Sequence, residues 1–314
     1  MAEDIDMHTI DRYELKSGAS CSIVPTWGCN LISWKVSGQE LMYAPEDYPE
    51  AAFKITGGGN PLLFPAVGRT WDHSSGEPVQ GVYKIYGSDK TYTMPSHGII
   101  YQSRFDKMDE KVTGESAVVA YELTIPDKVR EENYPFDMGF VQRFTLVENR
   151  VELETIITNK GDVPAPAAFG LHPYFRVSNP RREGIEVHVP VRKQLMLTSD
   201  TVLLTGEKKD TDGVMKLEPD VYYDHAFGEP VGQTMSLIDR KAGHTINVDY
   251  DEQFELFFVY SPDGSDFVCI EPWTRGLGAF EHLREPGWES GEFIPVLKPG
   301  EVKTYRAMFS VCGS

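Results

Sequence analysis

The 314-residue sequence has few of the features that mark several protein classes. It contains only four cysteines, and their spacing is not that of a metal site, so we expect buried free thiols rather than a disulfide framework. No stretch approaches the roughly 20 apolar residues of a membrane span, and the acidic start Met1–Asp6 lacks the apolar core of a signal peptide. We therefore expect a soluble, cytoplasmic protein without membrane contacts. The cysteines are Cys21, Cys29, Cys269 and Cys312.

Positive charge is also scarce. Lysine and arginine number 30 against 48 aspartates and glutamates, which gives a net charge of −18 and argues against nucleic acid or anionic membranes as partners. A local basic pocket for a small anion remains compatible with this surface. The eight histidines are dispersed without HxH or HxxxH spacing, so we expect no metal site.

Helical patterns are short, and strand patterns dominate. Weak helical patterns occur only near Asp127–Glu132 and Ala279–Leu283. Short alternating runs separated by Gly, Pro, Asn and Asp predict an antiparallel sandwich or barrel, and no break in composition divides residues 1–314 into domains. Phe254–Tyr260 is apolar on both parities, which indicates a strand covered on both faces. The other predicted strands lie at or near Ser22–Pro25, Leu31–Val36, Val119–Ile125, Phe140–Val147, Val151–Ile157, Ile185–Val189 and Ala307–Val311.

The most informative residue is Glu271, at the end of the apolar run Phe267–Trp273. A carboxylate in a buried strand is costly unless a partner or a reaction uses it. Alternation places Glu271 on the same face as Phe267 and Cys269, and Pro272 favours an extended backbone at Glu271. The arrangement is typical of a general base in a sugar pocket, although a strand-end glutamate that reaches solvent would give the same pattern.

Other segments place polar side chains at the ends of apolar runs. Asn60–Arg69 ends in an arginine whose planar donors suit hydroxyl or carboxylate oxygens. His97 lies at a turn before an apolar strand, and His172 ends the run before Pro173. A histidine can act as an acid near neutral pH if a carboxylate raises its pKa, but a lone histidine is more often structural.

Asp224 lies among aromatic residues and is suited to bind sugar hydroxyls, or it is an ordinary turn residue. Trp71, Phe175 and Trp273 are candidates to stack on the apolar face of a pyranose. The long loop Pro45–Asn60 ends in three glycines, which indicates flexible backbone beside a site or merely a turn.

Taken in order along the chain, these segments resemble the aldose 1-epimerase (galactose mutarotase-like) family. The likeness runs from about residue 20 to the C-terminus and is most specific around His172 and Glu271. The segments that carry it are Gly59–Pro65 with Gly68–Arg69, Ser96–Gly98, Tyr134–Phe136, Asn159–Asp162, Gly170–Phe175, Asp224–Phe227 and Ile270–Thr274.

The resemblance implies an all-β fold, a large antiparallel β-supersandwich with the sugar on the concave face of one sheet. It also implies a cofactor-free interconversion of α and β anomers of a sugar, by a monomer or homodimer. Glu271 would be the general base and His172 the general acid. His97, Arg69 and Asp224 would bind the sugar, and we add Asn60 and Trp273 to these substrate-binding residues.

Such a pair can open a hemiacetal ring. The base takes the anomeric hydroxyl proton while the acid protonates the ring oxygen, and each transfer is worth roughly 10²–10⁴-fold in rate. The freed aldehyde rotates and the ring recloses as the other anomer. We also expect an ionised Glu271 to raise the pKa of His172.

The sequence departs from the family pattern after Arg69, where Thr70-Trp71-Asp72 replaces the asparagine-containing continuation of galactose mutarotases. This leaves the substrate open between a free aldohexose and a hexose 6-phosphate. Arg104, Arg176 and Arg275 are the candidates to bind a phosphate. A non-catalytic sugar-binding or sensor protein of the same fold is a third possibility, although a binder needs no acid–base pair.

Overall fold

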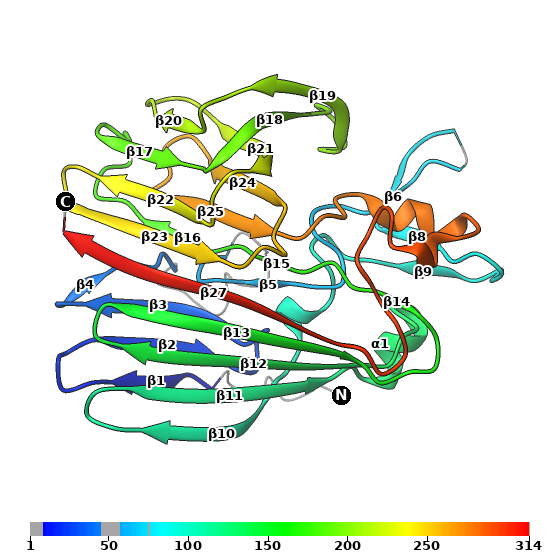
Figure 1. Cartoon of the computed structure of the whole chain (residues 1–314), viewed down its shortest axis with the longest axis horizontal. Coiled ribbons are helices and arrows are strands. Elements are labelled where there is room, and N and C mark those ends of the chain that lie inside the picture. The colour runs from blue at the N-terminus through cyan, green and yellow to red at the C-terminus, as the bar shows by residue number, and fades with distance from the viewer. Residues whose placement is uncertain (1–8, 45–56, 75, 314) are drawn as a thin grey trace, which may run out of the picture.

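The structure is a computed structural model that describes residues 9–44, 57–74 and 76–313. Antiparallel sheets make up nearly all of its regular structure, as predicted, and two large sheets dominate (Figure 1). Residues 45–56 of the predicted flexible loop lie outside the described ranges. The described residues contain no helix that is long and apolar enough to span a membrane.

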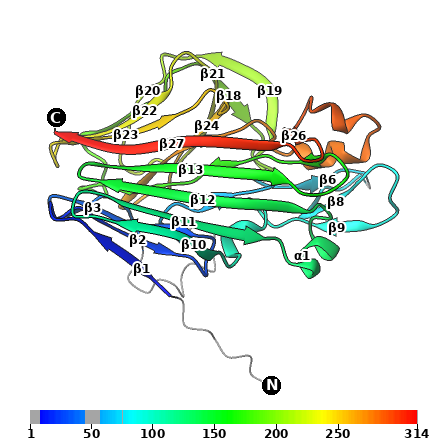
Figure 2. The same ribbon diagram turned by 60° about the horizontal axis from the view of Figure 1, so that its bottom comes forward.

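The first large sheet has nine strands, and β27, β13 and β12 run side by side through its middle (Figure 2). Its long strands alternate buried and partly exposed residues, so one face packs inward. In spatial order the strands are β10 (Asp106–Val112), β11 (Ala117–Thr124), β12 (Met138–Val147), β13 (Arg150–Asn159), β27 (Val302–Gly313), β23 (His244–Tyr250), β22 (Thr234–Asp239), β17 (Ile185–His188) and β20 (Val214–Lys216).

The second large sheet carries the run with Glu271. In spatial order its strands are β19 (Leu204–Asp210), β18 (Val191–Leu197), β21 (Tyr223–Pro230), β24 (Leu256–Ser261), β25 (Phe267–Trp273), β15 (Gly170–Leu171) and β5 (Leu62–Leu63), and β16 (Tyr174–Arg176) also pairs with β25. A smaller four-stranded sheet contains β1 (Asp11–Glu14), β2 (Ser20–Val24), β3 (Asn30–Val36) and β4 (Gln39–Glu40). It contacts the nine-stranded sheet where the Tyr13 and Tyr121 hydroxyls hydrogen-bond at 3.2 Å.

Short elements complete the chain. The hairpins β6–β7 and β8–β9 and the helix η3 lie together beside one end of the large sheets (Figure 1). Tyr83 of β8 packs edge-on against Phe280 of η3, with ring centres 4.9 Å apart. The bounds are β6 (Trp71–Asp72), β7 (Val79–Gln80), β8 (Val82–Lys84), β9 (Thr91–Thr93), β14 (Ala165–Pro166), β26 (Val296–Leu297), α1 (Asp127–Glu132), η2 (Ile100–Gln102), η3 (Ala279–Arg284) and η4 (Trp288–Ser290).

The main core lies between the two large sheets. Phe64 packs edge-on against Phe140, and Phe175 packs edge-on against Phe309, so side chains from both sheets meet in one apolar layer. Phe257 points the same way and contacts Tyr250. Phe258, the next residue, points to the opposite face and stacks on Trp273 at 4.1 Å.

Strand β24 is therefore covered on both faces, as the sequence pattern predicted. Its neighbour β25 is buried at all seven positions. Val268 and Ile270 belong to the main core, whereas Cys269 packs with Phe267 and Tyr174 in a separate apolar cluster on the other face. The face opposite the main core is thus also shielded from water, and Glu271 points into it.

The predicted strands correspond to β2, β3, β11, β12, β13, β17, β24 and β27, and both weak helical patterns form short helices, α1 and η3. The prediction for the thiols holds for Cys21, Cys29 and Cys269, which are buried. It is wrong for Cys312, which is exposed because β27 ends there.

Candidate active site

The register of β25 brings His172 and Glu271 together. Gly170 of β15 pairs with Trp273, and Tyr174 of β16 pairs with Cys269, so the same register continues on both sides of His172. Pro173 has no N–H to offer, which accounts for the break between β15 and β16. Position 172 therefore falls opposite position 271, and directly opposed residues of an antiparallel pair share one face of the sheet.

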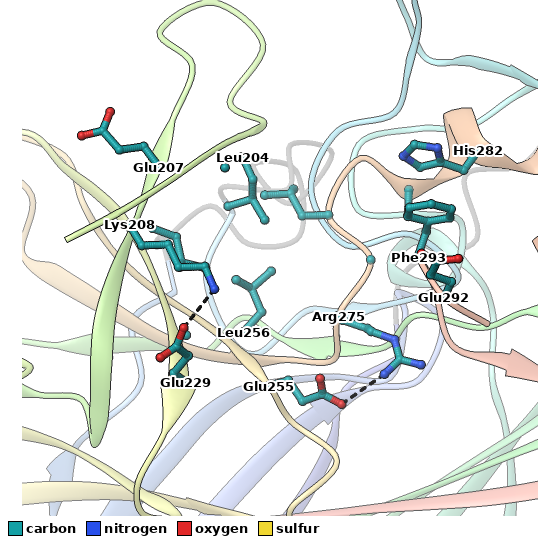
Figure 3. Close-up of a pocket in the computed structure, with 16 residues that line it drawn as sticks. Leu204, Glu207, Lys208, Glu229, Glu255, Leu256, Arg275, His282, Glu292 and Phe293 are labelled. Atoms are coloured by element: carbon teal, nitrogen blue, oxygen red, sulfur yellow. Dashed lines mark hydrogen bonds and ion pairs between the residues drawn. The ribbon is translucent and has the colours of Figure 1, made fainter. Parts of the chain in front are cut away.

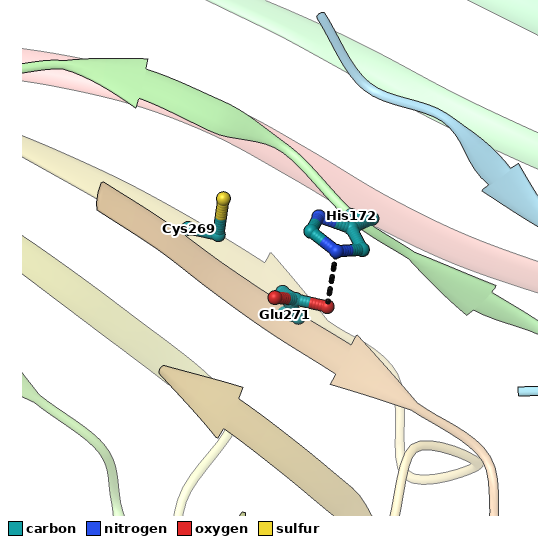
Figure 4. Close-up of side chains that lie close together, drawn as sticks. All are labelled: His172, Cys269 and Glu271. Atoms are coloured by element: carbon teal, nitrogen blue, oxygen red, sulfur yellow. Dashed lines mark ion pairs between the residues drawn. The ribbon is translucent and has the colours of Figure 1, made fainter. Parts of the chain in front are cut away.

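The two functional groups are close and almost fully buried. His172 Nε2 lies 3.4 Å from Glu271 Oε2, and the residues are 6% and 1% exposed (Figure 4). Within the described part of the chain, His172 Nδ1 and Glu271 Oε2 have no hydrogen-bond partner, and neither does the Trp273 indole nitrogen. Buried polar groups are rarely left unpaired, so three in one place mark a site for a polar ligand.

Burial shifts the pKa values of the two groups in opposite directions. It raises the pKa of the Glu271 carboxyl well above its usual range, and the nearby Asp224 adds to this shift. It lowers the pKa of His172 well below its usual value, and His97 adds to this. The pair by itself thus favours a neutral carboxylic acid beside a neutral imidazole.

The expectation that Glu271 raises the pKa of His172 is therefore wrong. Removing both groups from water disfavours both charged forms, and this is the largest cause of both pKa shifts. The number of protons on the pair does not change, because an acid beside an imidazole and a carboxylate beside an imidazolium each carry one proton.

Arg69 lies in the connection between β5 and β6, and His97 lies in the connection between β9 and η2. Two glycines allow these connections to pack tightly: Gly98 has φ +86° and a Cβ there would clash with the Phe64 carbonyl, while a Cβ on Gly68 would clash with Leu277. The Gly68 N–H donates to His97 Nδ1 at 3.2 Å, so the proton of a neutral His97 sits on Nε2.

Burial and the nearby Arg69 lower the pKa of His97 to about 3. His97 is therefore a neutral donor near neutral pH. Asp224 lies on β21, where Tyr260 is its cross-strand partner. Burial raises the pKa of Asp224, and Arg69 acts against that shift.

These side chains surround one cavity of about 160 Å³, in which Phe258 and Trp273 form an aromatic wall. The cavity brings together six of the seven predicted site residues, Arg69, His97, His172, Asp224, Glu271 and Trp273. The remaining lining residues are Gly68, Ser96, Val202, Tyr222, Phe258, Tyr260 and Leu277.

Asn60, the seventh predicted site residue, does not line this cavity. Its backbone N–H donates to Asn30, and its fully buried side-chain amide has no partner among the described residues. The His172 N–H donates to the Pro61 carbonyl, which places Pro61 opposite His172. Alternation along the strand then turns Asn60 to the other side.

Only one of the three aromatic residues that were predicted to stack on the sugar lines the cavity. Trp273 lines the cavity, but Phe175 belongs to the core between the sheets, because it faces the other way along β16. Trp71 lies outside the lining and donates its indole N–H to the Thr201 carbonyl at 3.0 Å. Tyr222 and Tyr260 also line the cavity, and the centres of their rings are 6.0 Å apart.

None of the three predicted phosphate-binding arginines lines the cavity. Arg104 pairs with Asp106, and Arg176 pairs with Asp266. Arg275 lies in a second cavity of about 410 Å³, where it pairs with Glu255 (Figure 3). Leu277 borders both cavities, so the second cavity is adjacent to the first.

Sequence reasoning missed several lining residues. Phe258 and Tyr260 could have been found, because they share one parity of a strand that was predicted to be covered on both faces. Val202 and Leu277 lie in connections that have no regular alternation of apolar and polar residues, so no local pattern predicts their place in the cavity.

Comparison with known proteins agrees with this architecture. The described fold is similar to the Slr1438 protein of Synechocystis sp. PCC 6803, with 24% identity, a TM-score of 0.81 and coverage of 100% of this chain and 99% of that one. It is also similar to a galactose mutarotase-like protein from Clostridium acetobutylicum, with 16% identity, a TM-score of 0.76 and coverage of 98% and 99%. A galactose mutarotase related enzyme from Lactobacillus acidophilus gives 22% identity, a TM-score of 0.76 and coverage of 97% and 98%.

At these identities the structural matches show the fold, a galactose mutarotase-like sandwich. No curated protein matches the sequence. The aldose 1-epimerase family model, by contrast, matches residues 11–310, which is almost the whole chain. The chain therefore belongs to the aldose 1-epimerase family.

Proposed function

We propose that this protein is a mutarotase that interconverts the α and β anomers of a free aldohexose by acid–base ring opening. The observation that carries the proposal is the buried pair of His172 and Glu271, which are 3.4 Å apart and line a cavity together with polar and aromatic side chains. Pockets for drug-sized ligands span roughly 300–1,000 Å³, so a cavity of about 160 Å³ suits a ligand as small as one sugar ring.

The pair supplies both proton transfers without a proton from solvent. Glu271 as carboxylate takes the anomeric hydroxyl proton, while His172 as imidazolium protonates the ring oxygen. The carbon–oxygen bond between C1 and the ring oxygen breaks, and an open-chain aldehyde forms. Rotation about C1–C2 presents the other face of the aldehyde, and the reverse transfers close the ring and restore the pair.

The reactive arrangement differs from the one that burial favours by the position of one proton. That proton moves from Glu271 Oε2 to His172 Nε2, over the 3.4 Å that separates the two atoms. A bound sugar favours the move, because its anomeric hydroxyl donates to the carboxylate and its ring oxygen accepts from the imidazolium. The two side chains are thus both neutral before the sugar binds, and they become a carboxylate and an imidazolium when it is bound.

The remaining cavity residues hold the sugar in place. Arg69 and Asp224 both line the cavity, and within the described residues neither side chain forms an ion pair. The Arg69 guanidinium donates to hydroxyl oxygens and the Asp224 carboxylate accepts from hydroxyl groups. His97 donates from Nε2, and the wall of Trp273 and Phe258 packs on the apolar face of the ring.

A free sugar fits this cavity better than a sugar phosphate. Arg69 is the one arginine among the lining residues, and Asp224 and Glu271 accompany it. Bidentate recognition of a phosphate calls for convergent cationic donors, and a carboxylate near the phosphate opposes it.

Anomeric exchange measured by proton NMR tests the proposal. Glucose, galactose, other aldoses and glucose 6-phosphate are each compared with the wild type, with Glu271→Gln and without protein. We expect the wild type to accelerate exchange of at least one free aldohexose and Glu271→Gln to lose the acceleration. A preference for glucose 6-phosphate would contradict the substrate class, and binding without any acceleration would identify a sugar-binding protein instead.

A further inference from the structure

Cys269 lies beside the acid–base pair, although it takes no part in the proposed reaction. It is two residues from Glu271 on β25 and points to the same face, while its cross-strand partner Tyr174 is two residues from His172. One nitrogen of His172, the Cys269 sulfur and one oxygen of Glu271 all lie within 4.8 Å of one another (Figure 4). The three residues are buried.

We propose that His172, Cys269 and Glu271 form a binding site for a thiophilic divalent cation such as Zn²⁺, and that a bound ion blocks the reaction. The site itself does not depend on the proposed function, whereas the inhibition does. On binding, the Cys269 thiol and the His172–Glu271 pair each release one proton to solvent. The donors are then an imidazole nitrogen, a thiolate sulfur and a carboxylate oxygen, which is the mixed set that Zn²⁺ takes in proteins.

The distances suit a tetrahedral ion. Zn²⁺ bonds of about 2.0–2.3 Å place neighbouring ligand atoms roughly 3.3–3.7 Å apart. His172 Nε2 and Glu271 Oε2 are already 3.4 Å apart. A pair at the 4.8 Å limit needs to close by only about 1.3 Å, which small side-chain rotations achieve.

Two of the ligand atoms contact each other: Glu271 Oε2 makes no hydrogen bond among the described residues, and its ion-pair contact is with His172 Nε2 at 3.4 Å. Cys269 and Glu271 stand on β25, and His172 lies in the two-residue break between β15 and β16, which both pair with β25, so much of the ordering that a metal site requires is already present. Three protein ligands leave a fourth position, which faces the cavity that His172 and Glu271 line.

The donor set discriminates between classes of cation. Mg²⁺ and Ca²⁺ prefer six or more oxygen ligands, and this cluster offers one carboxylate. Thiolate and imidazole favour Zn²⁺, Cd²⁺ and Co²⁺. We therefore expect Mg²⁺ to have no effect at concentrations at which Zn²⁺ binds.

An ion at this position occupies the lone pairs that proton transfer requires. Glu271 cannot take the anomeric proton, and His172 cannot donate to the ring oxygen, while both are ligands. Zn²⁺ and sugar then compete for the same side chains, so inhibition should be competitive with sugar and reversed by a chelator.

The test measures binding and activity separately in four proteins. Zn²⁺ binding is followed by calorimetry, and Co²⁺ binding by thiolate-to-metal charge-transfer absorption, for wild type, Cys269→Ser, Cys269→Ala and Cys312→Ser. Cys312→Ser is the matched control, because it removes an exposed thiol far along the sequence from the cluster. Anomerisation by each protein is then measured with and without Zn²⁺.

We expect one Zn²⁺ per wild-type chain and per Cys312→Ser chain, with the charge-transfer band. Either substitution of Cys269 should weaken binding by at least about 10-fold and remove the band. Both should keep the anomerisation rate of the metal-free wild type, because Cys269 does not line the cavity. Inhibition by Zn²⁺ should be lost along with binding.

No stoichiometric binding to the wild type, or equal binding after substitution of Cys269, would overturn the site. Binding that depends on Cys269 without inhibition would overturn the blocking role. Binding that depends on Cys269 in a protein with no anomerisation activity at all would support the site and contradict the proposed function.

Discussion

Two adjacent cavities lie on the same side of the eight-stranded sheet, and the smaller one carries the unusual chemistry. The larger cavity holds about 410 Å³, and it contains two exposed ion pairs: Lys208 pairs with Glu229 at 2.9 Å, and Arg275 pairs with Glu255 at 3.5 Å (Figure 3). The smaller cavity holds about 160 Å³ and surrounds the buried pair of His172 and Glu271.

Buried titratable groups with shifted pKa values therefore indicate a candidate site better than cavity volume does. Each exposed ion pair of the larger cavity contributes little free energy, about 0–1 kcal/mol. The buried pair of the smaller cavity has both pKa values displaced by burial, which is typical of functional sites. Matched substitutions in the two cavities therefore test which of them binds and converts the sugar.

The largest difference should come from one substitution in each cavity. Glu271→Gln keeps the size of the side chain and removes the base, so we expect kcat for anomerisation to fall by roughly 10²–10⁴-fold. Glu255→Gln makes the same chemical change in the larger cavity and should leave kcat within about 2-fold. Anomeric exchange NMR measures both, and equal losses would contradict a site confined to the smaller cavity.

The next largest difference between the two cavities should appear in KM. Asp224→Asn removes a charged acceptor, and hydrogen bonds to charged groups contribute about 1.5–3 kcal/mol, so KM should rise roughly 10–100-fold with a smaller change in kcat. Glu229→Gln, whose carboxylate pairs with Lys208, should leave KM unchanged. A rise in KM for Glu229→Gln alone would place the sugar in the larger cavity.

The pH profile should report the buried pair. The one-proton state of an unperturbed Glu–His pair spans about pH 4.3 to 6.5. Burial lowers the pKa of His172 and raises the pKa of Glu271, so it displaces both ends of that range. We therefore expect the limbs of the kcat/KM profile, which reports the free protein, to lie away from these two values. A narrow bell with limbs near pH 4.3 and 6.5 would contradict the burial of the pair.

The smallest effect concerns stability. Because the folded-state pKa of Glu271 is raised, the folded chain holds a proton that the unfolded chain releases above about pH 4.3, and stability falls as pH rises from there towards the folded pKa. Glu271→Gln should therefore raise Tm by about 2 °C, or about 1 kcal/mol, near neutral pH. Below about pH 4.3 this gain should disappear, whereas Glu255→Gln should show no gain at either pH. Thermal melts at both pH values measure these differences.

Local pattern predicted much of the fold and of the site. The alternation of β13 and β11 and the apolar run of β25 depend on short stretches of sequence, and the structure has them at those places. Glu271 and His172 stood out because each ends an apolar run before a proline. They line one cavity together with Arg69, His97, Asp224 and Trp273, and the resemblance to the family implied a sugar-binding role for the first three of these.

The predictions that were wrong concern features that depend on distant parts of the chain. The orientation of Asn60 follows from pairing with the strand that contains His172, more than 100 residues later, and no local pattern gives that register. The direction of the pKa shift of His172 depends on how deeply the other sheets and loops bury it. The ion pairs of Arg275 and Arg176 likewise require partners that only the folded chain brings near.

The central claim is that His172 and Glu271 act as one unit that holds one proton. Its most direct test is the anomeric exchange rate of four proteins: wild type, His172→Gln, Glu271→Gln and the double variant. If the two side chains act as a unit, either single loss disables both transfers, and the double variant should be no slower than the slower single variant. Losses that multiply in the double variant would show two independent contributions and contradict the account.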